Sequence, residues 1–170
     1  MKLDITEQML FALLRSALHG THADATIFAG ITSEAWQECY RLSVRQGVMA
    51  LAWDGLITLP TELQPPKSLK INWWLAVERC EKRYRYYCRV ISDLSTFYAT
   101  HGITAVQLKG VGFANNYPIP SHREGGDIDI FTYSADSSGL SDREANSLAD
   151  KLMRGRGIEG TVANIRGLFL

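Results

Sequence analysis

The chain has 170 residues, enough for one ordinary domain with a buried core or for a small domain with an appended element. Its 18 Lys and Arg residues balance 18 Asp and Glu residues, which excludes an overall electrostatic preference for nucleic acid or an anionic membrane. The N-terminus is too acidic and polar for a secretory signal, and no apolar run approaches the roughly 20 residues of a membrane span, so we expect a cytoplasmic protein.

The first hundred residues show the apolar spacing of helices. Polar residues suited to capping precede the periodic stretches, and glycines end two of them. The spacing predicts helices from Asp4 or Thr6 to Gly20, from Thr32 or Ser33 to Gly47, over residues 48–56, and over residues 67 to about 100. Three cysteines form no CxxC pair, and we expect reduced, buried thiols at Cys39, Cys80 and Cys88.

The middle of the longest predicted helix, residues 79–89, interleaves five basic residues with three tyrosines. Such a face can follow a nucleic-acid backbone and stack bases. The other interpretation is an ordinary amphipathic helix, in which Glu78 and Glu81 neutralise the basic side chains. We favour the amphipathic helix.

From Gly102 onward the pattern changes to short strands and helices. Residues 103–108 predict an apolar strand, which turns through glycines into one or two helical turns at 113–117. Two prolines then impose an extended crossing before a second strand over 127–133. A capped helix over 141–157 and the start of a third strand within 158–165 complete the pattern. We therefore expect an α+β fold, with a helical region over residues 1–100 packed on a small mixed sheet with flanking helices over residues 101–170.

Acidic and apolar residues alternate in the segment GDIDIF, residues 126–131. Alternate side chains of a strand share a face, so we expect Asp127 and Asp129 to project together while Ile128 and Ile130 enter the core. Two parallel carboxylates repel each other unless a cation lies between them, and Mg²⁺ takes oxygen ligands of this kind. The alternation therefore predicts a metal site, whereas the alternative is the solvated face of a half-exposed strand.

A glycine turn precedes these acids and favours the functional interpretation. Backbone N–H groups at the helix start that follows Gly110 and Gly112 can hold a phosphate group. In the alternative, Lys109 and Arg123 are surface ion-pair partners of the acids, contributing about 0 to 1 kcal/mol each. His122 lies in a polar loop, and we expect it to be solvated.

The ordered combination of Leu-Lys-Gly at 108–110, Tyr-Pro at 117–118, Arg123 and Gly-Asp-Ile-Asp at 126–129 resembles the nucleotidyltransferase core of the DNA polymerase beta superfamily. The nearest likeness is to poorly characterised bacterial members, and it is best over residues 103–131. The resemblance implies transfer of a nucleoside monophosphate from a nucleoside triphosphate to a hydroxyl of an acceptor: a protein, an RNA or a small molecule. It assigns two Mg²⁺ ions to Asp127 and Asp129, and the nucleotide to Lys109, Gly110, Gly112 and Arg123.

One departure from the family pattern concerns a third carboxylate, which active members place on a later strand. After Asp150 the only acid here is Glu159. Either Glu159 substitutes, or the acid comes from elsewhere, or the chain is a shortened, C-terminally incomplete version that binds nucleotide poorly or not at all. The alternative function is then a catalytically inactive binding or regulatory, antitoxin-like protein. The apolar terminus at residues 168–170 fits a chain cut inside a core element and covered by a protein partner.

Overall fold

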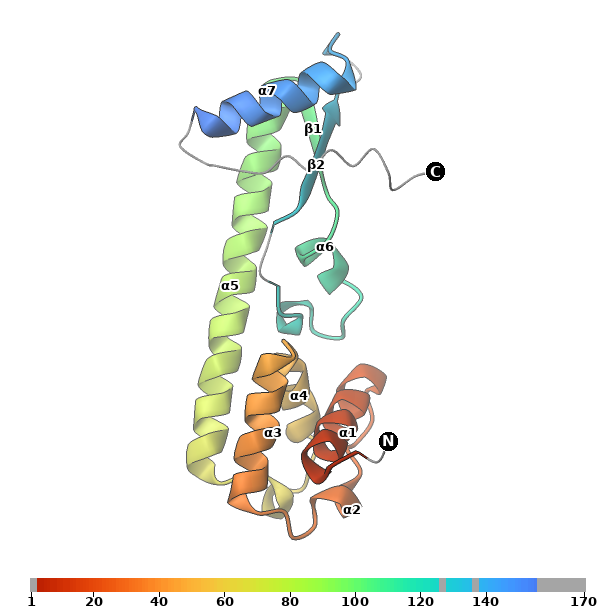
Figure 1. Ribbon diagram of the computed structural model, residues 1–170, viewed down its shortest axis with the longest axis vertical. Coiled ribbons are helices and arrows are strands. Elements are labelled where there is room, and N and C mark those ends of the chain that lie inside the picture. The colour runs from red at the N-terminus through yellow and green to blue at the C-terminus, as the bar shows by residue number, and fades with distance from the viewer. Residues whose placement is uncertain (1–2, 126–127, 136–137, 156–170) are drawn as a thin grey trace. The chain divides into compact units, whose positions relative to one another are not determined.

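The computed structural model describes residues 3–125, 128–135 and 138–155. Contacts along the chain divide it into two units, residues 1–89 with 109–128 and residues 90–108 with 129–170, and each has its own hydrophobic core. The division runs through the 33-residue helix α5 (Lys67–Ala99), the longest helix in Figure 1. Helices combined with a two-stranded antiparallel sheet confirm the expected α+β class.

The first unit is largely helical, and its helices begin where capping residues predict. Asp4 accepts from the Glu7 amide at 2.8 Å in a capping box, Gly20 ends the first helix at φ +63°, and Thr32 caps the third. The second helix is only four residues long, which is too short for apolar periodicity to predict it. The elements before α5 are α1 (Ile5–His19), α2 (Ala25–Phe28), α3 (Ser33–Arg45), α4 (Met49–Leu56) and the 3₁₀ turn η1 (Thr61–Leu63).

The core of this unit lies between α1, α3, α4 and the N-terminal part of α5. Its fully buried large side chains include Met9, Leu13, Phe28, Leu56 and Trp73. Helix α4 approaches α1 so closely at Gly55 that a Cβ there would lie 2.1 Å from the Leu13 carbonyl oxygen. The Trp73 indole donates to the Met49 carbonyl at 2.9 Å, which also fixes the start of α4 against α5.

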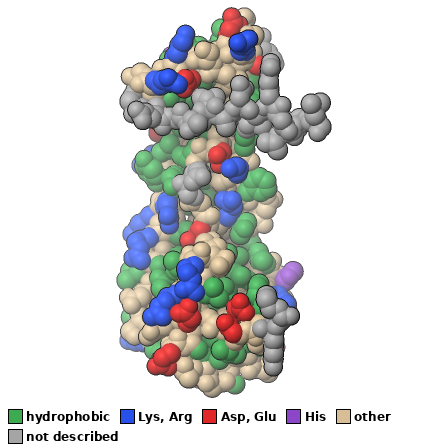
Figure 2. Space-filling view, viewed as in Figure 1, with side chains coloured by type: hydrophobic (Ala, Val, Ile, Leu, Met, Phe, Trp, Pro, Cys, Tyr) green, Lys and Arg blue, Asp and Glu red, His purple; other side chains and the backbone are tan. Residues whose placement is uncertain are grey.

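The same unit contains the segment after the glycine turn, with α6 (Val111–Ala114) and the 3₁₀ turn η2 (Pro120–His122). All three cysteines are free thiols: Cys39 and Cys80 are buried and Cys88 is half-buried. Figure 2 shows acidic and basic side chains interspersed with hydrophobic ones on the face in view, in keeping with the balanced charge. Among the described residues, no helix is both long and apolar enough to span a bilayer.

The second unit pairs strand β1 (Ile103–Gln107) with β2 (Ile130–Ser134) in antiparallel register, Ile103 opposite Ser134 and Gln107 opposite Ile130. Helix α7 (Asp142–Arg154) packs on β2 and starts from a capping box at Ser141. The buried residues of this unit are Tyr98, Ile103, Ala145 and Ala149.

Strand β2 begins at Ile130, three residues later than the alternation of acids predicts. Ile128 and Ile130 are half-buried, so the expectation that they enter a core was wrong. The physical reason is the partner strand, because β1 ends at Gln107, opposite Ile130, and the chain then turns at Gly110. The predicted third strand, Glu159 and the apolar terminus lie outside the described residues.

Candidate functional site

The glycine turn after β1 is closed by an arginine from a later segment. Gly110 has φ +69° and ψ −122°, a backbone conformation that is essentially restricted to glycine, and it directly precedes α6. The Arg123 guanidinium donates to the Gly110 carbonyl oxygen at 3.0 Å. Of the residues predicted to contact a nucleotide, the structure therefore brings Gly110 and Arg123 together. Lys109, just before the turn, and Gly112, within α6, are exposed.

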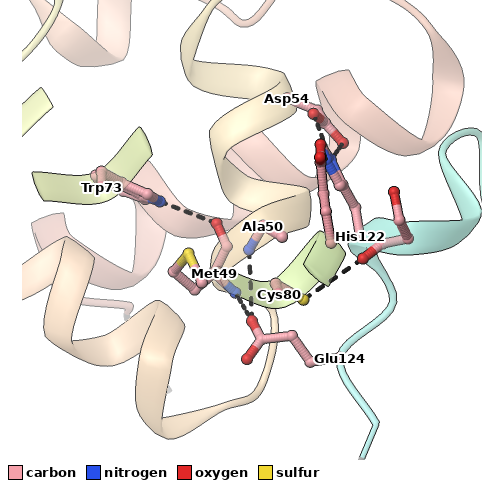
Figure 3. A network of polar contacts seen from close by, with 9 residues as sticks. Met49, Ala50, Asp54, Trp73, Cys80, His122 and Glu124 are labelled. Atoms are coloured by element: carbon pink, nitrogen blue, oxygen red, sulfur yellow. Dashed lines mark hydrogen bonds and ion pairs between the residues drawn. The ribbon is translucent and has the colours of Figure 1, made fainter. Parts of the chain in front are cut away.

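The segment that carries Arg123 is fastened to the helical core by the residues on either side of it (Figure 3). Glu124 accepts hydrogen bonds through Oε1 from the amides of Met49, at 2.6 Å, and Ala50, at 3.4 Å. These amides open α4, whose own N-cap residue Val48 supplies no side-chain cap. A carboxylate at this position satisfies two otherwise unpaired donors and complements the helix dipole. No local pattern predicts this cap, because Glu124 lies 75 residues after Met49 in the chain.

His122 is buried on the other side of Arg123, and its ring lies between two carboxylates. Nδ1 is 2.8 Å from both Asp54 carboxylate oxygens, and Nε2 is 3.1 Å from Oε1 of Glu81. Only the protonated imidazolium donates from both nitrogens. The expectation of a solvated histidine was therefore wrong, because its partners come from α4 and α5, far away in the sequence.

The protonation of this cluster follows from its surroundings. Burial alone would lower the pKa of His122, but the hydrogen bonds to Asp54 and Glu81 outweigh it and raise the pKa above the usual 6.5. The hydrogen bond from His122 in turn lowers the pKa of Glu81 against the opposing effect of burial, with a further contribution from Arg85. A cationic His122 beside an anionic Glu81 is the state that these two shifts favour.

The glycine turn also borders a narrow pocket together with one face of α5. Side chains at helical spacing on α5 line one side of the pocket. The glycine turn and the segment around Arg123 line the other side. The lining residues are Cys80, Arg83, Tyr84, Tyr87, Gly110, Val111, Arg123 and Gly125. The α5 residues were not among the predicted site residues, although their alternation of arginine and tyrosine was visible in the sequence.

Of the two predicted metal ligands, the structure describes Asp129, whereas Asp127 lies outside the described residues. Asp129 is half-buried and directly precedes β2, and its carbonyl oxygen accepts from the Leu108 amide at 3.1 Å. Leu108, which makes this hydrogen bond, is followed directly in the chain by Lys109 and the glycine turn. Within the described ranges, no three His, Cys, Asp or Glu side chains gather to hold an ion. Carboxylate oxygens such as those of Asp127 and Asp129 are nevertheless the donors that Mg²⁺ prefers.

Comparison with known proteins defines the class as nucleotidyltransferase. A family model described as an uncharacterised nucleotidyltransferase matches residues 32–142, more than half of the chain. This range runs from the cap of α3 to the start of α7 and includes the glycine turn, Arg123 and both predicted metal ligands. The chain therefore belongs to this uncharacterised nucleotidyltransferase family. Searches of curated proteins and of solved structures find no match.

Proposed function

We propose that the protein transfers a nucleoside monophosphate from a nucleoside triphosphate to a hydroxyl group of an acceptor. The observation that carries the proposal is the closed turn in which Arg123 donates to Gly110, inside the range matched by the nucleotidyltransferase family. Family membership supports a nucleotide as substrate. The turn supplies what a triphosphate requires: backbone without an obstructing side chain, and a fixed cation beside it.

The chain's own residues would bind and orient the triphosphate. The hydrogen bond to Gly110 uses one of the five N–H donors of the Arg123 guanidinium and holds the others at the edge of the turn. His122 and Glu124, both anchored to the helical core, hold Arg123 in this place. Lys109 and Gly112 would complete the contacts to phosphate oxygens, Lys109 as a point charge and Gly112 through its backbone.

Asp127 and Asp129 would hold two Mg²⁺ ions through their carboxylate oxygens. When bound, these ions would align the α-phosphate with the attacking hydroxyl and neutralise the charge on the departing pyrophosphate. The alternation of these acids with apolar residues, immediately before β2, supports this role. In the transfer, the acceptor oxygen bonds to the α-phosphorus while the bond from that phosphorus to the bridging oxygen of pyrophosphate breaks.

Labelled nucleotides test the proposal. The purified protein is incubated with Mg²⁺, a cell extract that supplies acceptors, and a nucleoside triphosphate labelled at either the α- or the γ-phosphate. We expect only the α-label to become acceptor-bound, and we expect Asp129→Asn to abolish the transfer. Asp93→Asn, which removes the same charge from an exposed position of α5, serves as the matched control. Transfer of the γ-label, or equal transfer by both variants, would contradict the proposal.

A second candidate function is a catalytically inactive binding or regulatory protein of the same fold. The specific observation in its favour is the composition of residues 151–170, in which Glu159 is the one acid available as the third carboxylate that the resemblance implies. The two candidates differ in the same assay, because an inactive protein would transfer neither label. Loss of transfer in Glu159→Gln would favour the active enzyme with Glu159 as its third carboxylate.

A further inference from the structure

One face of α5 meets the glycine turn at the narrow pocket described above. Cys80, Arg83, Tyr84 and Tyr87 follow one another at steps of three, one and three residues, which places all four on the same side of a helix. Gly110, Val111, Arg123 and Gly125 face them. All these residues belong to the first unit, so the pocket lies within one compact body.

The lining of the pocket has an excess of positive charge. Two guanidinium groups, those of Arg83 and Arg123, reach it, and none of its described lining residues is acidic. Two neighbouring cations on α5 have ion-pair partners, Lys82 with Glu78 and Arg85 with Glu81, each at 3.4 Å. Arg83 makes no such ion pair with any described residue. Its side chain lines the pocket, where no described acidic residue provides a counter-ion.

Two described carboxylates in this unit, those of Glu124 and Glu81, already have other partners. Glu124 caps α4, and Glu81 pairs with His122 and Arg85, so neither supplies the missing counter-ion. Burial, with a contribution from Glu124, raises the pKa of Cys80 to about 11, so the thiol is neutral and does not repel an anion. The thiol donates instead to the Ser121 carbonyl, at 3.4 Å.

The size of the pocket limits what enters it. Its volume is about 10 Å³, close to the space of one water-sized sphere. A nucleobase does not fit, whereas a single phosphoryl oxygen does. The exposed Arg83 forms the outer rim, and Arg123, hydrogen-bonded to Gly110, forms the fixed wall.

We infer that Arg83 and Arg123 together form a subsite for a phosphoryl group, with Tyr84 and Tyr87 as its walls. The inference deepens the proposed function, since it extends the nucleotide site beyond the predicted residues to α5. The phosphoryl group has two chemical sources, the triphosphate of the nucleotide or a phosphate on the acceptor. The subsite also gives the basic and aromatic stretch of α5 a role other than binding a nucleic-acid backbone.

Inorganic tripolyphosphate, titrated calorimetrically at constant ionic strength in the presence of EDTA, tests the subsite without any metal. We expect Arg83→Gln and Arg123→Gln each to weaken binding by about tenfold or more, as expected for loss of a charged hydrogen-bonding partner. Lys82→Gln removes the same charge from the next residue of α5, whose side chain pairs with Glu78, and we expect it to bind like the wild type. Arg83 is exposed, so its substitution leaves the core intact.

Competition then identifies the source of the phosphoryl group. If a nucleoside triphosphate displaces tripolyphosphate, the subsite holds the nucleotide, and if both bind together, it holds a phosphate of the acceptor. Absence of wild-type binding, unchanged affinity in Arg83→Gln, or an equal loss in Lys82→Gln would overturn the inference. The proposed function fails separately: Arg83-dependent binding with no effect of Asp129→Asn on Mg²⁺–nucleotide binding would retain the subsite and reject the transferase. Tripolyphosphate binding that does not depend on Arg83, together with a loss of Mg²⁺–nucleotide binding in Asp129→Asn, would reject the subsite alone.

Discussion

Nδ1 of His122 lies 2.8 Å from both carboxylate oxygens of Asp54, a residue 68 positions earlier in the chain. On the other side of the ring, Nε2 lies 3.1 Å from Glu81. Because these residues come from η2, α4 and α5, one histidine joins the segment that carries Arg123 to two helices. The His122 side chain is 5% exposed, so water contributes little to stabilising its charge and the two carboxylates do so instead.

The first prediction is that His122→Asn destabilises the protein. The substitution leaves Asp54 and Glu81 without their shared cation, and breaking a buried pair typically costs about 3 to 5 kcal/mol. Because Glu81 is partly solvated, with 34% of its side chain exposed, we expect a smaller loss, about 2 kcal/mol in the free energy of unfolding. Urea denaturation measures the change. His19→Asn, at the exposed end of α1, is the control, and an equal effect of both substitutions would contradict the assigned role.

The contribution of His122 to stability should also depend on pH. Its folded-state pKa is raised above 6.5, so the imidazolium stabilises the folded state fully below pH 6.5 and progressively less as the pH rises through the raised value. The charges that face it are Asp54 on α4 and Glu81 on α5, and Arg85 pairs with Glu81. Glu81 has a lowered pKa, so its contribution is lost only in acid, as the pH falls through that value.

Urea denaturation of wild type and His122→Asn at a series of pH values measures this dependence. We expect the stability difference between the two to be largest near pH 6 and to shrink toward alkaline pH. A difference that grows above pH 6.5 would mean that His122 is neutral in the folded protein.

Glu124 is a second, independent link between the segment that carries Arg123 and the start of α4. Glu124→Ala removes the acceptor for the amides of Met49 and Ala50, and loss of a helix cap typically costs about 1 kcal/mol. Glu124→Gln keeps an acceptor oxygen and loses only the interaction of the charge with the helix dipole, so we expect a smaller cost. Thermal denaturation of both variants gives the comparison. If the glutamine variant is as unstable as the alanine variant, the charge rather than the hydrogen bonds is the main contribution.

The backbone conformation of Gly110 predicts that an alanine there is destabilising. At Gly110, φ of +69° with ψ of −122° strains any other residue, and such a conformation costs on the order of 1 to 3 kcal/mol. Gly110→Ala should therefore lower both stability and Mg²⁺–nucleotide binding. Gly112 lies in α6 and is not among the residues with positive φ, so Gly112→Ala should leave the stability unchanged within about 0.5 kcal/mol. Equal stability of the two variants would contradict the turn geometry.

Local signals in the sequence predicted the helices and the turn well. The boundaries of α1, α3 and α7 follow from caps that involve residues three positions apart, such as Asp4 with Glu7 and Ser141 with Glu144. The residue types at the turn, a glycine and a later arginine, also suggested that the two act at one site, and the structure shows them in contact.

Long-range contacts were not predictable in the same way. The loop that carries His122 contains prolines, serine and charged residues, a composition typical of a solvated segment. No neighbouring residue in the sequence indicates that Asp54 and Glu81 lie on either side of the ring. The same holds for Glu124 as the cap of α4 and for the pocket face of α5, since single-sequence periodicity reports which residues share a helix face but not what packs against that face.

The proposed role of Asp127 and Asp129 is to hold metal ions for a bound nucleoside triphosphate. Calorimetric titration with a nucleoside triphosphate in the presence and absence of Mg²⁺ tests this role, on the wild type and on the double variant Asp127→Asn with Asp129→Asn. We expect Mg²⁺-dependent binding to the wild type that the double variant loses. Equal heats from the two proteins, or binding by the wild type that is indifferent to Mg²⁺, would contradict it.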